Sequence, residues 1–117
     1  MLTKEQWKNL ARFAGITIEE DGVDINGLQW YWSPELVKHW NPEFDWRDFG
    51  PLWVKLERWL AHEWELELPI AVHTQINAFY DAEMRGTEQE LMQAGCALGA
   101  TIGATMKPAL AADKETP

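Results

Sequence analysis

Cysteine is almost absent from this sequence. Cys96 is the only one among 117 residues, so the chain forms no internal disulfide. A lone cysteine is typical of a reducing compartment, which predicts a cytoplasmic protein. The first residues also lack the basic segment and the apolar run of a signal peptide, which supports the same expectation.

Long apolar runs are missing as well. The longest uncharged stretch, residues 91–106, is shorter than the roughly 20 apolar residues that a membrane span needs, and it contains a glutamine and two threonines. We therefore expect no membrane partner. The hydrophobic fraction of 46% is enough for one buried core, so residues 1–106 are predicted to form a single domain and residues 107–117 a disordered tail.

Positive charge is scarce. The formal net charge is −9, and between residues 59 and 106 seven acidic residues accompany a single base, Arg85. A surface of this sign repels phosphate backbones, which argues against direct nucleic-acid binding. A partner with a basic surface fits the charge better.

No motif for a metal, a cofactor or a catalytic group is present. His39, His62 and His73 form no H-x-x-x-H pair, and Cys96 lies far from all three along the chain. A zinc site needs three or four ligands. Cys96 falls between small residues of a predicted helix, which favours a packed side chain over a nucleophile. We therefore expect no metal, no cofactor and no enzymatic activity.

The first half of the chain carries clear local signals. A helix is predicted to begin at the capping box of Thr3 and Gln6 and to end at Gly15. Residues 16–32 alternate in polarity, and Asn26-Gly27 is typical of a type I′ hairpin turn. These patterns predict a meander of two or three antiparallel strands.

Two further helices are predicted next. Ser33-Pro34 resembles an N-cap followed by proline, which indicates a short helix that must end before Pro42. A longer helix follows near Asp45, and Gly50-Pro51 either kinks it or marks its true start. The buried stripe of this helix contains Leu52, Leu56, Trp59 and Leu60.

The second half is predicted to hold two strands and a last helix. Residues 64–68 and 72–80 alternate in polarity, and a capping box of Thr87 and Glu90 begins a helix that ends near Met106. The whole pattern predicts an α+β fold. Its antiparallel or mixed sheet of about four or five strands carries helices packed on it, in an α-β-α sandwich-like arrangement.

Several short motifs resemble those of the phage ABA sandwich domains, which are small proteins encoded by phages and prophages. They are the Trp40-Asn41-Pro42 turn, Asp45-Trp46 with its following helix, the segment 64–68, and residues 87–91 at the start of the last helix. The likeness follows the order of elements over roughly residues 1–106. It implies a phage origin and a sheet covered by helices, and it supplies no catalytic residues. The many tryptophans and the glycine-rich last helix depart from the family pattern.

A row of carboxylates is the first candidate site. On a strand, Glu63, Glu65 and Glu67 would share one face with about 6.6 Å between neighbours. That spacing is close to the repeat of phosphates in a nucleic acid, so the row could occupy a basic groove of a partner. The alternatives are a solvated strand face and carboxylates paired for acid–base catalysis.

The tryptophans form the second candidate site. Four of the eight coincide with predicted buried stripes and are expected in the core, namely Trp7, Trp53, Trp59 and Trp64. The other four gather around turns and a predicted strand, namely Trp30, Trp32, Trp40 and Trp46. Because tryptophan is enriched at binding hot spots, we predict that the second group contacts a partner.

Glycine recurs every four residues in the last helix, at Gly95, Gly99 and Gly103. Each interior glycine costs about 1 kcal/mol relative to alanine, so three on one face indicate that another backbone packs very close. Either another part of the same chain or a second copy in a homodimer could occupy this face.

The leading hypothesis is an acidic, phage-encoded protein that inhibits a host or defence protein, in the manner of an anti-CRISPR. It would act by occupying a basic surface and not by catalysis. Two alternatives stay open. One is a small-ligand-binding or enzymatic domain that uses an aromatic pocket, and the other is a self-associating virion or scaffold accessory protein.

Overall fold

The computed structural model describes residues 2–63 and 68–105. Its helices are α1 (Lys4–Ala14), α2 (Trp46–Glu63), α3 (Ile70–Arg85) and α4 (Glu88–Thr105). Its strands are β1 (Glu19–Val23), β2 (Gln29–Ser33) and β3 (Lys38–His39), which form an antiparallel sheet in the order β1-β2-β3. The predicted α+β class is confirmed, but the described part of the chain has three strands in place of four or five.

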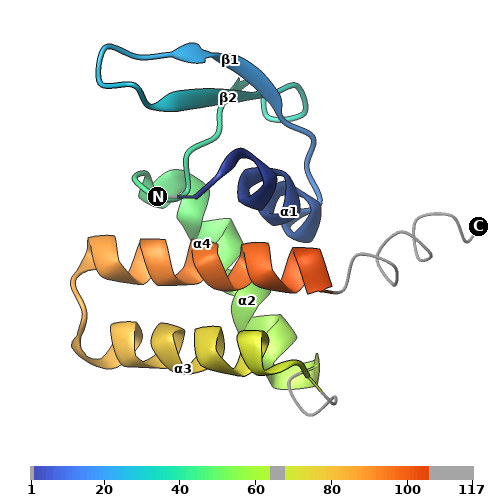
Figure 1. Cartoon of the computed structure of the whole chain (residues 1–117), viewed down its shortest axis with the longest axis vertical. Coiled ribbons are helices and arrows are strands. Elements are labelled where there is room, and N and C mark those ends of the chain that lie inside the picture. The colour runs from blue at the N-terminus through green and yellow to red at the C-terminus, as the bar shows by residue number, and fades with distance from the viewer. Residues whose placement is uncertain (1, 64–67, 106–117) are drawn as a thin grey trace, which may run out of the picture.

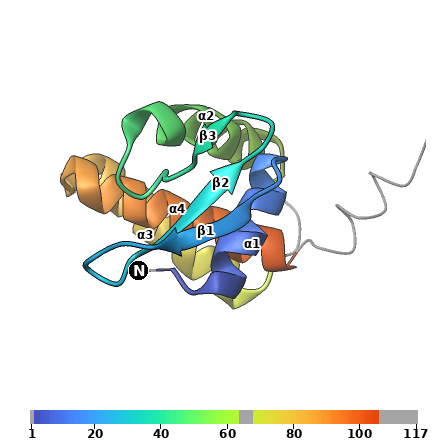
Figure 2. The same ribbon diagram turned by 90° about the horizontal axis from the view of Figure 1, so that it is seen from above.

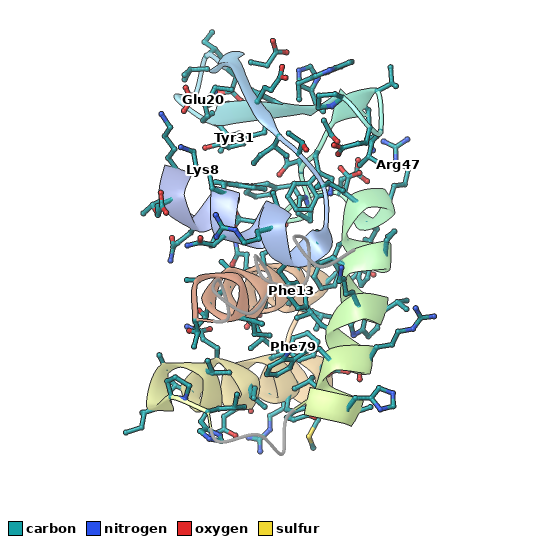
Figure 3. All side chains as sticks on the ribbon, turned by 90° about the vertical axis from the view of Figure 1, so that its right-hand side faces the viewer. Lys8, Phe13, Glu20, Tyr31, Arg47 and Phe79 are labelled. Carbon is teal, nitrogen blue, oxygen red and sulfur yellow. The ribbon has the colours of Figure 1, made fainter. Side chains whose placement is uncertain are left out.

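The elements are arranged as a stack with one helix beside it. The sheet, α1, α4 and α3 follow one another, and α2 runs along one side of the stack (Figures 1 and 3). The sheet therefore covers one end of a helical body instead of lying between helical layers. This differs from the predicted sandwich, because only the inner face of the sheet is packed.

Both predicted capping boxes are confirmed. At the start of α1, Thr3 N donates to Gln6 Oε1 at 2.7 Å, and Gln6 N donates to Thr3 Oγ1 at 3.2 Å. Thr87 and Glu90 make the same pair of bonds at the start of α4. Gly15 ends α1 with φ of 79°, a left-handed conformation that glycine adopts without steric cost.

The predicted hairpin is present, but its turn is not type I′. A type I′ turn needs positive φ at both central residues, and Gly27 has it whereas Asn26 does not. The loop is instead organised by Asp24, whose Oδ1 accepts from the backbone N–H groups of Asn26 and Leu28 at 2.8 and 3.0 Å. An aspartate that bonds its own following backbone replaces the tight turn with a longer one.

The predicted short helix after Ser33 is wrong. Residues 34–37 form a turn, and Lys38–His39 is strand β3. Trp40 N donates to Tyr31 O at 2.9 Å, so the chain pairs back onto β2. This pairing carries Trp40 into an aromatic layer between the sheet and α1, where its ring centroid lies 5.9 Å from that of Trp7. Burial of a large aromatic side chain outweighs the local helix signal.

Helix α2 begins at Trp46 and continues through Pro51, so Gly50-Pro51 does not mark its start. The predicted stripe is confirmed for Leu52, Leu56 and Leu60, which are buried. The four tryptophans predicted for the core differ in how deeply they are buried. Trp7 is buried, Trp53 and Trp59 are half-buried, and Trp64 lies outside the described residues.

The strand predicted over residues 72–80 is wrong, because this segment belongs to α3. Val72, Ile76 and Phe79 are buried at helical spacing and face α4, whereas Tyr80 is exposed. The strand predicted over residues 64–68 lies almost entirely outside the described residues. Its last residue, Leu68, is described and is not in a strand. The predicted tail also lies outside them.

Candidate partner-binding surface

The outer face of the sheet carries two tryptophans. Side chains of a strand point alternately to its two faces, and on β2 Tyr31 and Ser33 are buried on the inner one. Trp30 and Trp32 therefore lie on the outer face, where both are half-buried. No described element covers this face (Figure 2).

His39 of β3 lies against both tryptophans. Its ring centroid is 5.5 Å from that of Trp30 and 5.3 Å from that of Trp32, with edge-on geometry in both cases. Its Nε2 is 2.5 Å from Oδ2 of Asp21 on β1. These four residues, Trp30, Trp32, His39 and Asp21, are called the outer cluster below. They bring all three strands together on one surface.

The carboxylate of Asp24 borders the outer cluster on the hairpin side. The Nε1 of Trp30 donates to Asp24 Oδ2 at 3.2 Å. The backbone N–H of Leu28, with smaller contributions from Asn26 and Trp30, lowers the pKa of Asp24, so this carboxyl group is ionised at neutral pH. Trp32 has no such bond to any described residue, and its indole N–H is available to a partner.

The hairpin that joins β1 and β2 carries exposed apolar side chains. Val23 is 62% exposed and Ile25 is 99% exposed. Large apolar side chains near an exposed aromatic cluster and carboxylates are typical of an interaction surface. The outer face thus combines an aromatic centre with acidic groups.

Two of the tryptophans predicted to bind a partner lie elsewhere. Trp40 is 4% exposed in the core, so the prediction for this residue is wrong. Trp46 is half-buried at the start of α2, where its ring packs on Phe49 and its Nε1 donates to Glu88 Oε2 at 3.1 Å. The structure therefore brings together Trp30 and Trp32 and leaves out Trp40 and Trp46. The pairing of β1 and β3 with β2 places Asp21 and His39 beside the two tryptophans, and the sequence pattern did not reveal this pairing.

Of the predicted carboxylate row, only Glu63 lies within the described residues. Glu63 is the last residue of α2, so the alternation that placed it with Glu65 and Glu67 does not apply to it. Glu65 and Glu67 lie outside the described residues. The acidic groups of this surface are Asp21 within the outer cluster, on β1, and Asp24 at its border, in the hairpin.

The glycine face of α4 packs against helices of the same chain. A Cβ atom at Gly95 would lie 2.6 Å from the Phe49 ring, and one at Gly99 would lie 2.6 Å from Leu10 Cδ1. At Gly103 it would overlap the backbone of Asn9 in α1. The face is therefore occupied intramolecularly, which is the first of the two alternatives raised by the sequence.

A pair of carboxyl groups connects α2 and α3. Burial, the charge of Glu57 and a hydrogen bond with Glu57 together raise the pKa of Glu83 to about 7. The Nε1 of Trp53 donates to Glu57 Oε1 at 3.1 Å. Sequence patterns missed this pair because its members lie on different helices.

Within residues 2–63 and 68–105, no group of three or more histidine, cysteine, aspartate or glutamate side chains could hold a metal ion. In the same described part, no helix is long and apolar enough to cross a membrane. Comparisons with protein families, with curated proteins and with solved structures give no match. The resemblance to the phage ABA sandwich domains therefore stays a prediction.

Proposed function

We propose that this chain is a non-enzymatic protein-binding domain whose outer cluster contacts a basic surface of another protein. The observation that carries the proposal is the pair Trp30 and Trp32, half-buried and next to carboxylates, on a sheet face that no described element covers. A partner would bury the exposed part of both rings.

The chemistry of the outer cluster fits arginine or lysine side chains. A cation is attracted to the face of a tryptophan ring, and a nearby carboxylate adds a charged hydrogen bond. Trp32 offers an indole N–H without a described partner, and Asp21 is exposed beside it. Tryptophan also loses little conformational entropy on binding, which is one reason why it is frequent at hot spots.

The biological setting of the proposal follows from the resemblance and the charge. We place the protein among phage-encoded inhibitors that act in the host cytoplasm on a host or defence protein. The net charge of −9 supports attraction to a basic partner over a distance, which raises the rate of encounter.

Affinity capture from phage-infected cells tests the proposal. The tagged chain is compared with Trp32→Ala, and Ile70→Ala serves as a control because Ile70 is an exposed apolar residue on α3, at 83% exposure. We expect Trp32→Ala to weaken binding of the captured protein by about tenfold or more, as for a hot-spot residue. Equal binding by Trp32→Ala and the wild type would place the interface elsewhere.

The dependence of the association rate on salt distinguishes the contribution of charge to binding from that of the tryptophans. Exposed charges are screened beyond about 10 Å at 0.1 M salt, so the association rate should fall as salt is added. Asp21→Asn should reduce this dependence, and it should also speed dissociation because a charged hydrogen bond to the partner is removed. An association rate that is unaffected by salt would contradict the basic-partner part of the proposal.

A further inference from the structure

A pocket lies away from the outer cluster, between the end of α1, the β2–β3 turn and the first turns of α2. Its volume is about 230 Å³. Apolar side chains form most of its walls, namely Ala14, Ile16, Leu36, Trp40, Pro51 and Leu52. Three segments that are distant in the sequence therefore build one concave apolar site.

The charged side chains of this pocket are mainly cationic, in a chain with a net charge of −9. Lys38, Arg47 and Lys55 line it together with one acid, Asp48. Arg47 extends from the start of α2 into solvent at the rim (Figure 3). Lys55 places its ammonium group 5.8 Å from the centre of the Phe13 ring. Among the side chains that line the pocket, cations thus outnumber acids, unlike in the whole chain.

The single acid of the pocket is already neutralised. The side chain of Asp48 is 4% exposed, and its Oδ1 accepts from Lys38 Nζ at 2.6 Å. Its Oδ2 accepts from the backbone N–H of Asn41 at 2.9 Å. A ligand would therefore meet little repulsion from Asp48.

Two more carboxylates lie near the rim, and both have partners. Asp45 accepts from Nε and Nη2 of Arg47, which leaves Nη1 of this arginine as a donor. Glu35 accepts from the backbone N–H of Thr17 at 2.7 Å. Nη1 of Arg47 can therefore donate to an incoming anion.

The turn beside the pocket is strained. Val37 has φ of 53°, an unfavourable conformation for a β-branched residue, and it lies between the lining residues Leu36 and Lys38. Strain of this kind is concentrated at ligand sites, where it holds side chains in position. Leu36 is 45% exposed at the pocket and would be covered by a ligand.

We propose that this pocket binds a small monocarboxylic acid with an apolar, aromatic or branched body. The body would fill the apolar walls, and the carboxylate would accept from Nη1 of Arg47 at the rim. The volume lies below the range of about 300–1,000 Å³ for drug-sized ligands, which limits the ligand to a small one. This site is independent of the proposed protein-binding surface.

The test uses 3-phenylpropanoate and its uncharged amide, 3-phenylpropanamide, as matched probes. Each is titrated into the ¹⁵N-labelled full chain, and amide shifts are followed by NMR. We expect the acid to shift residues 14–16, 36–40 and 47–55, and to bind about tenfold more tightly than the amide because charged hydrogen bonds are stronger. Absence of shifts in these segments at millimolar acid would overturn the proposal.

Two arginine variants identify the charge that is responsible. Arg47→Ala should weaken binding of the acid about 3- to 10-fold and leave binding of the amide unchanged. The control is Arg85→Ala, because Arg85 is similarly exposed and also contacts an aspartate, Asp81, but lies outside the pocket. Equal binding of acid and amide, or an unchanged affinity in Arg47→Ala, would show that the pocket does not recognise carboxylates.

Discussion

Gly103 of α4 lies so close to Asn9 of α1 that a Cβ atom at this glycine would overlap the Asn9 carbonyl oxygen. The obstacle is backbone, so it can be relieved only if the two helices separate. We predict that Gly103→Ala lowers the free energy of unfolding by about 3 kcal/mol or more, at the upper end of overpacking costs. Chemical denaturation measures the change.

Two neighbouring positions provide the comparison for Gly103→Ala. Gly99→Ala should cost less, because its Cβ meets the flexible end of Leu10. Ala104→Ser, at an exposed position of the same helix, should change stability by about 0.5 kcal/mol or less. A loss at Gly103 no larger than that at Ala104 would show that α1 and α4 do not approach as closely as described.

A larger side chain at Gly99 distinguishes packing within the chain from dimer formation. The Leu side chain of Gly99→Leu would collide with Leu10 and Phe13 of α1. We expect a melting temperature that is lower than that of the wild type at every protein concentration, with an unchanged sedimentation coefficient. A dimeric wild type that becomes a monomer of unchanged melting temperature would contradict this expectation.

The carboxyl groups of Glu57 on α2 and Glu83 on α3 interact, which predicts that the stability of the protein depends on pH. The pKa of Glu83 is raised from 4.5 to about 7, so the folded state binds the proton more tightly than the unfolded state. The contribution of Glu83 is therefore fully present below pH 4.5 and is lost as the pH rises to about 7. The melting temperature should fall over this interval in the wild type.

Glu83→Gln cannot ionise and should flatten that part of the pH profile, with a melting temperature above that of the wild type at pH 8. Glu5→Gln, at an exposed position in the first turn of α1, should keep the slope of the wild type. If Glu83→Gln leaves the slope as it is, the pH dependence comes from other groups.

Cys96 should be unreactive in the folded protein. It is fully buried in α4, and burial raises the pKa of its thiol, with a smaller contribution from the charge of Glu43. Because the thiolate is the reactive form, a thiol reagent should modify the native protein only at the rate of opening and the denatured protein at once. Rapid native modification would indicate that α4 is not enclosed as described.

The sequence by itself determined the elements whose signals are local. The capping boxes of Thr3 and Thr87 fix the starts of α1 and α4, because each box satisfies backbone N–H groups within one turn. Gly15 ends α1 for a similarly local reason. Alternation in residues 28–32 also placed Trp30 and Trp32 on a common face of one strand, since the period of a strand needs no tertiary contact.

Tertiary contacts decided the segments whose signals were ambiguous. In residues 72–80, Val72 and Ile76 fit both a strand period and a helical spacing, and packing of Phe79 on α4 selected the helix. After Ser33, the chain pairs with β2 instead of forming the predicted helix, and this pairing buries Trp40. It leaves the Ser33 hydroxyl without a hydrogen bond in the described part of the chain.

For the candidate sites too, the sequence predicted some features and the tertiary structure decided others. Spacing alone showed that something approaches the glycine face of α4, but only the fold showed that α1 occupies it at Gly99 and Gly103. The pairing of β3 with β2 places His39 against the tryptophans, and the apolar pocket is built by residues from three separate segments. A sequence pattern reports which face of an element a side chain occupies. What that face contacts depends on how distant segments pack, because burial energy is shared among all of them.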